Sequence, residues 1–269
     1  MNTFNELFSH ENRRRLNVGH SAHAGRQDIL WVLPDSEEQF LKNKKDKKQA
    51  KKLRKAGWTA TNVKYKYNTH GFRGDELEYS SDKSILFLGC SHTFGTGINH
   101  EDTMAYLVSK SLGYKCYNLS LIGGSINLLF SYAYHWIPKL KPDIVVVMQP
   151  HELRIGWYDG LKCPDANGGS DIGSWINLSP NNVKTLFQNT LEFYMSWSSR
   201  TINTTLNMES NTLAIKQICY ENNAKCYTFS SEELFKSEKV DDARDLLHAG
   251  KQTNINAANF ILDAINVND

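Results

Sequence analysis

Ser91 is the first residue whose type and position suit a chemical role. It follows the apolar run at residues 85–88 and comes directly after Gly89-Cys90. A short run that is apolar throughout predicts a strand buried on both faces of a parallel sheet. Open α/β sheets bind their ligands at the carboxyl ends of such strands. The Ser91 hydroxyl is therefore a candidate nucleophile, and an ordinary Gly-x-Ser turn is the alternative.

Asp245 and His248 form a second candidate pair near the end of the chain. A carboxylate three residues before a histidine can accept a hydrogen bond from the ring and fix its tautomer. The other ring nitrogen can then take a proton from a hydroxyl. Together with Ser91, the pair would complete a Ser-His-Asp triad. A surface ion pair is the alternative for Asp-x-x-His taken alone.

A third candidate lies in the run Asn118-Leu-Ser-Leu-Ile-Gly-Gly-Ser125. Gly123 and Gly124 can present backbone N–H groups without steric cost, as an oxyanion hole requires. A plain turn into a helix capped by Ser125 explains the same residues, and the two interpretations are compatible.

The elements that must position these residues alternate along the chain. Strands are predicted at 85–88, 114–119, 143–148 and 225–229, and helices at 103–112, 126–140 and 254–265, with 183–222 mostly helical and broken near Asn203. Strands separated by helices favour right-handed βαβ units and a parallel sheet covered on both faces. The Gly-, Asn- and Trp-rich segment 153–180 is predicted to be a long loop of the kind that forms lids.

The first 60 residues differ from the rest in charge. They contain 13 Lys and Arg against 7 Asp and Glu, whereas the remainder contains 18 against 22. We expect a basic, largely helical or irregular extension at 1–60 and a catalytic domain at 61–269. The lysine-rich segment 37–56 favours an exposed helix over a nucleic-acid site, because no aromatic residues interleave with its lysines for base stacking. Removal of residues 1–57 is expected to leave the activity intact.

Composition excludes several classes of protein. No stretch reaches the roughly 20 apolar residues that span a membrane, and the N-terminal residues lack the apolar core of a signal peptide. Five scattered cysteines without Cys-x-x-Cys suit a reducing compartment, so a cytoplasmic protein is expected. Cys90 and His92 have no visible third ligand for zinc, and no Gly-rich phosphate loop follows a strand.

The three candidate blocks, in this order, resemble those of the SGNH (GDSL-type) hydrolases over about residues 62–267. Gly89-Cys90-Ser91-His92-Thr93 is similar to the block with the nucleophile, Asn118 with Gly123 to the block with an oxyanion donor, and Asp245 with His248 to the acid and base. The resemblance implies a flavodoxin-like three-layer α/β/α sandwich. It also implies a serine esterase or acyl hydrolase that acts through an acyl-enzyme without cofactor or metal.

Two positions depart from the family pattern. Cys90 replaces the aspartate before the nucleophile. The usual Gly-x-Asn-Asp block is replaced by Gln149-Pro-His-Glu152, which puts His151 where the oxyanion-binding asparagine is expected. An imidazole N–H can donate the same hydrogen bond, and Gln149 and Arg154 are alternatives.

Trp157, Tyr158 and Trp175 lie in the predicted loop. They favour a small-molecule or glycan ester as the substrate, such as an acetylated carbohydrate, although loop tryptophans also serve as anchors.

The rival hypothesis is a binding or structural module that keeps the fold and has lost catalysis. The sequence leaves the acyl group, the alcohol and the oligomeric state open.

Overall fold

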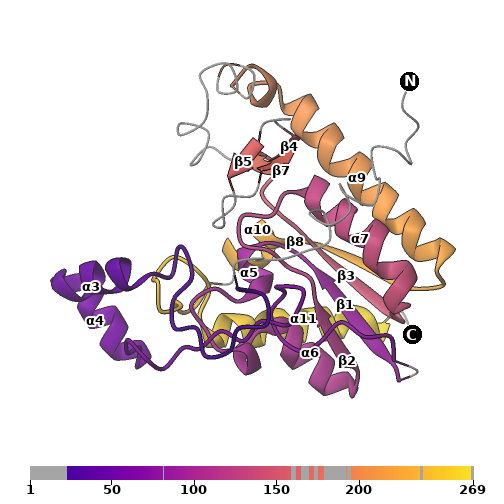
Figure 1. Ribbon diagram of the computed structural model, residues 1–269. Helices are drawn as coiled ribbons and strands as arrows, with labels where there is room; N and C mark the ends of the chain where they lie inside the picture. The colour runs from indigo at the N-terminus through magenta and orange to yellow at the C-terminus, as the bar shows by residue number, and fades with distance from the viewer. Residues whose placement is uncertain are drawn as a thin grey trace.

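The computed structural model describes residues 23–80, 82–158, 162–164, 170–172, 175–178, 192, 195–236 and 239–267. Its centre is a parallel sheet with strand order β2-β1-β3-β8. Figure 1 shows the four strands side by side in this order. The strands are β1 (Ser84–Leu88), β2 (Lys115–Asn118), β3 (Ile144–Gln149) and β8 (Lys225–Ser230). The four predicted strands are therefore present, with no end shifted by more than one residue.

Helices cover both faces of this sheet (Figure 1). On one face α7 (Ile126–Leu140) and α9 (Thr201–Glu221) pack on Leu86, Leu88 and Val145. On the other face α6 (Met104–Leu112) and α11 (Lys251–Val267) pack on Ile85 and Phe87. Because side chains alternate across a strand, the two faces of β1 enter separate apolar cores. The predicted three-layer α/β/α sandwich with a flavodoxin-like central sheet is confirmed.

Local capping explains where the helices begin and end. Thr103 and Ser125 accept backbone N–H groups at the starts of α6 and α7, which is the usual role of hydroxyl side chains at helix N-termini. Gly113 ends α6 with φ 68°, a left-handed conformation that favours glycine. The helix α7 has the predicted bounds, and α11 begins three residues earlier than expected. The predicted break near Asn203 lies three residues earlier: residues 195–198 are helical, 199 and 200 are not, and α9 begins at Thr201.

Short elements connect these layers. They are α5 (Ser91–Phe94), the 3-10 turn η2 (His100–Asp102) and α10 (Ser231–Lys236). The predicted loop after β3 contains two antiparallel pairs, β4 (Ile155–Tyr158) with β7 (Trp175–Leu178) and β5 (Lys162–Pro164) with β6 (Ser170–Ile172). The side chains of Trp157, Tyr158 and Trp175 lie outside the described part of the chain.

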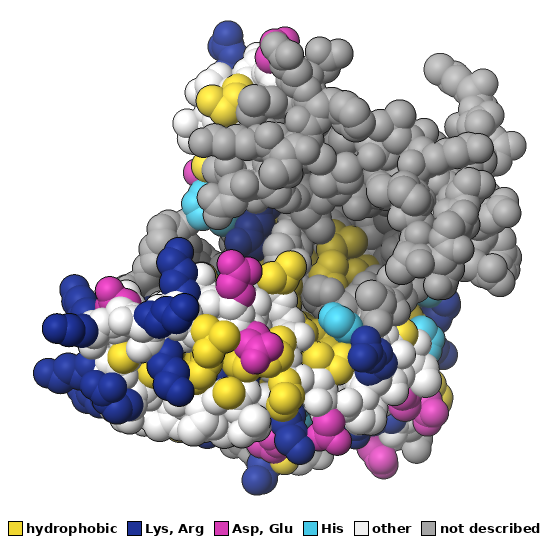
Figure 2. Space-filling model, turned by 60° about the vertical axis from the view of Figure 1, so that its left-hand side comes forward, with side chains coloured by type: hydrophobic (Ala, Val, Ile, Leu, Met, Phe, Trp, Pro, Cys, Tyr) yellow, Lys and Arg dark blue, Asp and Glu magenta, His cyan; other side chains and the backbone are white. Residues whose placement is uncertain are grey.

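The N-terminal segment packs on the body beside the sheet. It contains α3 (Glu37–Lys45) and α4 (Lys47–Ala56), with Asp46 between them as the N-cap of α4. Their exposed lysines form the dark blue group in Figure 2. Their opposite faces enter a third apolar cluster, in which Phe40 and Leu53 meet residues of the loops around the sheet. The boundary at residue 60 stays a prediction, but a freely removable appendage does not fit residues 29–58.

This packing gives a first testable prediction. Leu53 is 3% exposed in the third cluster, whereas Leu41 on the neighbouring helix is 47% exposed. Leu53→Ala should lower the free energy of unfolding by about 2–4 kcal/mol, because it leaves a cavity, and the matched Leu41→Ala should lower it by less than about 0.5 kcal/mol. Urea denaturation of the full chain measures both. Equal, small effects would mean that the segment contributes nothing to the core.

Candidate active site

Ser91 lies at the carboxyl edge of the sheet, where β1 turns into α5. Gly89 makes this sharp turn possible, since a Cβ there would come within 2.1 Å of Thr93 Oγ1. Asn118, at the end of β2, fixes the same loop by donating its side-chain amide to the Thr93 carbonyl at 3.1 Å. The Ser91 side chain is 4% exposed, so the surrounding loops hold it in place with its hydroxyl toward the loop after β8.

Ser91, His248 and Asp245 form one hydrogen-bonded chain. Ser91 Oγ lies 2.8 Å from His248 Nε2, and His248 Nδ1 lies 2.5 Å from Asp245 Oδ2. The imidazole side chain is 12% exposed and the carboxylate is buried. These are the contacts through which an imidazole can take a hydroxyl proton while a carboxylate orients it.

The Asp245 carboxylate stays ionised in this setting. Burial alone would raise the pKa of Asp245, but its hydrogen bond and charge interaction with His248 outweigh that effect, and the pKa lies below its ordinary value. The backbone N–H groups of Leu247 and His248 add two hydrogen bonds to Oδ1, each 3.0 Å. Leu246 adopts φ 61° to close this turn. The turn thus presents a fixed carboxylate to one side of the ring.

The N-terminal segment holds this turn from behind. Arg244, directly before Asp245, is fully buried and forms an ion pair with Asp35 at 2.7 Å. Its guanidinium also donates to the carbonyls of Leu30, Ala60 and Val63. On the other side, the Asn43 side chain of α3 donates to the Asp245 carbonyl at 3.2 Å. Residues 30–63 therefore contact both sides of the Asp245 backbone.

Two backbone N–H groups of these loops make no hydrogen bond to another described residue. One belongs to Ser91 itself, in the first turn of α5. The other belongs to Gly123, which has φ 77° in the turn closed by the Gly124 N–H and the Leu121 carbonyl at 3.0 Å. The Leu121 N–H binds the Gly89 carbonyl at 3.1 Å, which fixes this turn beside the loop that carries Ser91.

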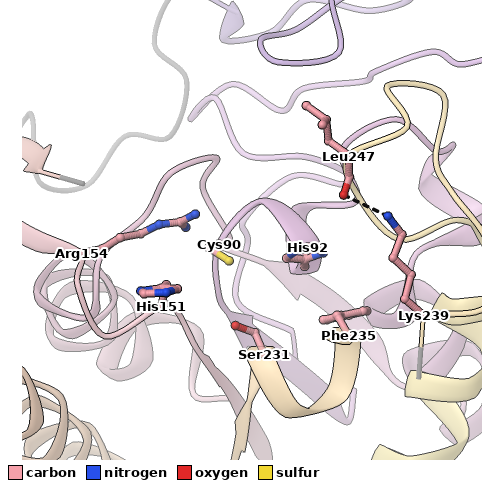
Figure 3. Close-up of a pocket in the computed structure, with 8 residues that line it drawn as sticks. All are labelled: Cys90, His92, His151, Arg154, Ser231, Phe235, Lys239 and Leu247. Atoms are coloured by element: carbon pink, nitrogen blue, oxygen red, sulfur yellow. Dashed lines mark hydrogen bonds between the residues drawn. The ribbon is translucent and has the colours of Figure 1, made fainter. Parts of the chain in front are cut away.

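A pocket of about 390 Å³ is lined by the sequence neighbours of Ser91 and His248 (Figure 3). Cys90 and His92, the neighbours of Ser91, line it together with Leu247, the neighbour of His248. His151 and Arg154 enter from the segment between β3 and β4, as Figure 3 shows. The remaining lining residues are Ser231, Phe235 and Lys239.

Three residues are candidate replacements for the missing oxyanion-binding asparagine, and only two of them line the pocket. Gln149 donates its side-chain amide to Thr212 of α9 at 3.0 Å, away from the pocket. His151 and Arg154 both line the pocket. The Nδ1 atom of His151 accepts the Leu153 N–H at 3.2 Å, so in a neutral imidazole Nε2 carries the proton and is the donor.

His92 is a neutral group in this pocket. Its ring stacks on Phe235 with centroids 4.7 Å apart and lies 5.0 Å from the His248 ring. Burial, with the neighbouring His248 and Arg154, lowers the pKa of His92 to about 3. The described residues contain no group of three or more His, Cys, Asp or Glu side chains suited to a metal ion, so Cys90 and His92 have no third ligand among them.

Sequence reasoning missed several residues of the site. Asp35, Asn43 and Arg244 hold the turn that carries Asp245, and Ser231, Phe235 and Lys239 line the pocket. Arg244 offered a signal, because a charged residue stands directly before Asp245, but its partner lies 209 residues away. No local pattern marks a contact over that distance.

Comparisons with known proteins give similarity at the level of structure. No family model and no curated protein matches the chain. Solved structures similar to it include a psychrotrophic esterase from Pseudoalteromonas sp. (TM-score 0.37, 15% identity, 70% of this chain and 100% of that chain). Others are a GDSL-like lipase from Bacteroides thetaiotaomicron (0.33, 12%, 72% and 93%) and an acetyl xylan esterase (0.31, 14%, 68% and 99%).

GDSL-type lipases are among the solved structures to which this chain is similar. At these identities and TM-scores the functional proposal rests on the chain's own residues. Within the part of the chain that is described, no helix has the length and apolar character to cross a bilayer. The carboxyl edge of the sheet carries a serine, an imidazole and an ionised carboxylate in one hydrogen-bonded chain.

Proposed function

We propose that this protein is a serine esterase that works through an acyl-enzyme. The observation that carries the proposal is the chain of two hydrogen bonds from Ser91 Oγ through His248 to Asp245. Ser91 Oγ attacks the ester carbonyl carbon while His248 Nε2 takes its proton. The Asp245 carboxylate stabilises the imidazolium that forms. His248 then returns the proton to the departing alcohol.

A water molecule completes the reaction, with His248 acting again first as a base and then as an acid. His248 takes a proton from a water molecule, which attacks the acyl carbon, and the Ser91 oxygen leaves with that proton as the acid is released. Both tetrahedral intermediates carry a negative oxygen. The N–H groups of Ser91 and Gly123 are the proposed donors to it, with His151 Nε2 as the third, in place of the family's asparagine.

The role of His151 leads to a second prediction. His151→Ala should lower kcat by about 10²-fold with little change in KM, because the lost hydrogen bond strengthens only in the transition state. His151→Asn, which restores an amide donor, should recover part of the rate. Steady-state kinetics on an ester such as p-nitrophenyl acetate measures both variants. An unchanged kcat in His151→Ala would remove His151 from the oxyanion hole.

The substrate class is proposed from two features. The pocket beside Ser91 is small, about 390 Å³, which suits a short acyl group or a small alcohol. The aromatic residues at 157, 158 and 175 in the sequence favour a carbohydrate acetate. Release of acetate from acetylated monosaccharides and oligosaccharides, compared with release from p-nitrophenyl acetate, tests this choice.

The experiment that tests the proposed function is hydrolysis of p-nitrophenyl acetate by the purified full chain. We expect turnover with saturation kinetics. A protein that neither hydrolyses this ester nor any acetylated sugar would contradict the proposal. It would favour a binding module that keeps the fold, for which the replacement of the usual asparagine by His151 is the supporting observation.

A further inference from the structure

We propose that the pocket beside Ser91 binds a negatively charged group of the substrate, and that Arg154 is the residue that recognises it. The inference rests on the proposed function, which it narrows to esters bearing a carboxylate or a similar anion. None of the described side chains lining the pocket is acidic. An anion bound there therefore meets positive and neutral groups.

The charge of Arg154 is not neutralised by the described residues. Arg154 forms no ion pair with them, and its Nη1 atom is buried without a hydrogen-bond partner. The Arg154 side chain lines the pocket, and Figure 3 shows its guanidinium pointing toward Cys90. A buried N–H of a charged group without a partner costs free energy. An anionic ligand oxygen would remove that cost, and a planar guanidinium suits a carboxylate or phosphate.

The other cation of the pocket is already paired. Lys239 Nζ lies 2.7 Å from an Asp242 carboxylate oxygen and donates to the Leu247 carbonyl at 3.1 Å. Its charge therefore serves the loop before Asp245. Of the two cationic side chains that line the pocket, Arg154 is therefore the one that has no acidic partner among the described residues.

One further polar group in the pocket fits the same ligand. His92 Nδ1 is buried without a partner among the described residues, and the neutral ring can donate one N–H. The Ser231 hydroxyl already donates to the Gln149 carbonyl at 2.6 Å and has no second proton for the anion. Phe235 and Leu247 supply apolar walls. The pocket thus suits a small organic anion better than a free inorganic ion.

Binding to the Ser91→Ala protein tests the inference without requiring catalysis. Titration calorimetry would compare two matched pairs: monomethyl adipate with dimethyl adipate, and 3-acetoxybenzoate with its methyl ester. The first pair puts the anion on the acyl side and the second on the alcohol side. We expect the anionic member of at least one pair to bind about 10- to 100-fold more tightly, the usual effect of one charged hydrogen bond.

Added to Ser91→Ala, Arg154→Gln should abolish this preference and Arg154→Lys should keep part of it. The control is Arg54→Gln, which changes an arginine of α4 that does not line the pocket. In the catalytically intact chain, Arg154→Gln should lower the ratio of kcat/KM for the anionic ester to that for its neutral partner by a similar factor.

The outcomes separate the two proposals. Equal binding of charged and neutral esters, or a preference that survives Arg154→Gln, would overturn the anion site. An Arg154-dependent preference without turnover by the intact chain would keep the anion site and refute the esterase. Turnover by the intact chain without any preference for the charged ester would support the esterase and overturn the anion site.

Discussion

Ser91→Ala is expected to lower kcat for p-nitrophenyl acetate by about 10⁴- to 10⁶-fold. The variant removes the oxygen that forms the acyl-enzyme, and the rest of the site can offer only binding and oxyanion stabilisation to a direct attack by water. KM should change little, because the hydroxyl lies 2.8 Å from His248 and makes its decisive contact only as the bond to the substrate forms. Steady-state kinetics on freshly purified protein measures both parameters.

The control for this loss is Ser210→Ala, which removes the hydroxyl of a serine on the exposed face of α9. That variant should retain full activity. Thermal unfolding of both variants should resemble that of the parent chain, which excludes misfolding as the cause. A Ser91→Ala protein that hydrolyses the ester within tenfold of the parent rate would refute the mechanism, whatever the source of the residual activity.

Asp35→Asn is expected to destabilise the chain by about 3–5 kcal/mol, the usual cost of removing one partner from a buried ion pair. Asp35 accepts the Arg244 guanidinium at 2.7 Å and the Tyr65 hydroxyl at 2.6 Å, and all three side chains are buried. Because Arg244 adjoins Asp245, we also expect kcat to fall at temperatures where the variant is folded. Denaturation and kinetics at low temperature separate the two effects.

The exposed ion pair between Lys52 and Asp242, 2.9 Å long, provides the comparison. Lys52→Gln breaks a contact between the same segment and the same loop, but solvent screens it, so the cost should stay below about 1 kcal/mol. If Asp35→Asn also cost less than about 1 kcal/mol and left kcat unchanged, residues 30–63 would not position the triad. Activity that survives deletion of residues 1–57 would lead to the same conclusion.

The sheet and most of its helices could be predicted because their patterns are local. The run at 85–88 is apolar throughout, and Ser125 and Gly113 mark helix ends. The break predicted near Asn203 is found at residues 199 and 200, just before α9 begins at Thr201.

The N-terminal segment was harder to predict, because its composition is dominated by lysines. Only Phe40, Leu53 and a few other residues face the body, and they are too sparse to form a visible pattern along the chain. In the site, the spacing of Asp245 and His248 and the Gly-x-Ser turn were visible in the sequence. Two features were not visible, since both depend on the fold: the buried pair of Asp35 with Arg244, and the Arg154 guanidinium, whose Nη1 has no partner among the described residues.

Covalent labelling with a fluorophosphonate, followed by mass spectrometry of the peptides, would identify the nucleophile of this site. We expect one adduct per chain, located on Ser91, with loss of esterase activity in proportion to labelling. We also expect much slower labelling in His248→Gln, because the serine hydroxyl then has no base. Labelling at another residue, or activity that persists in fully labelled protein, would contradict Ser91 as the nucleophile.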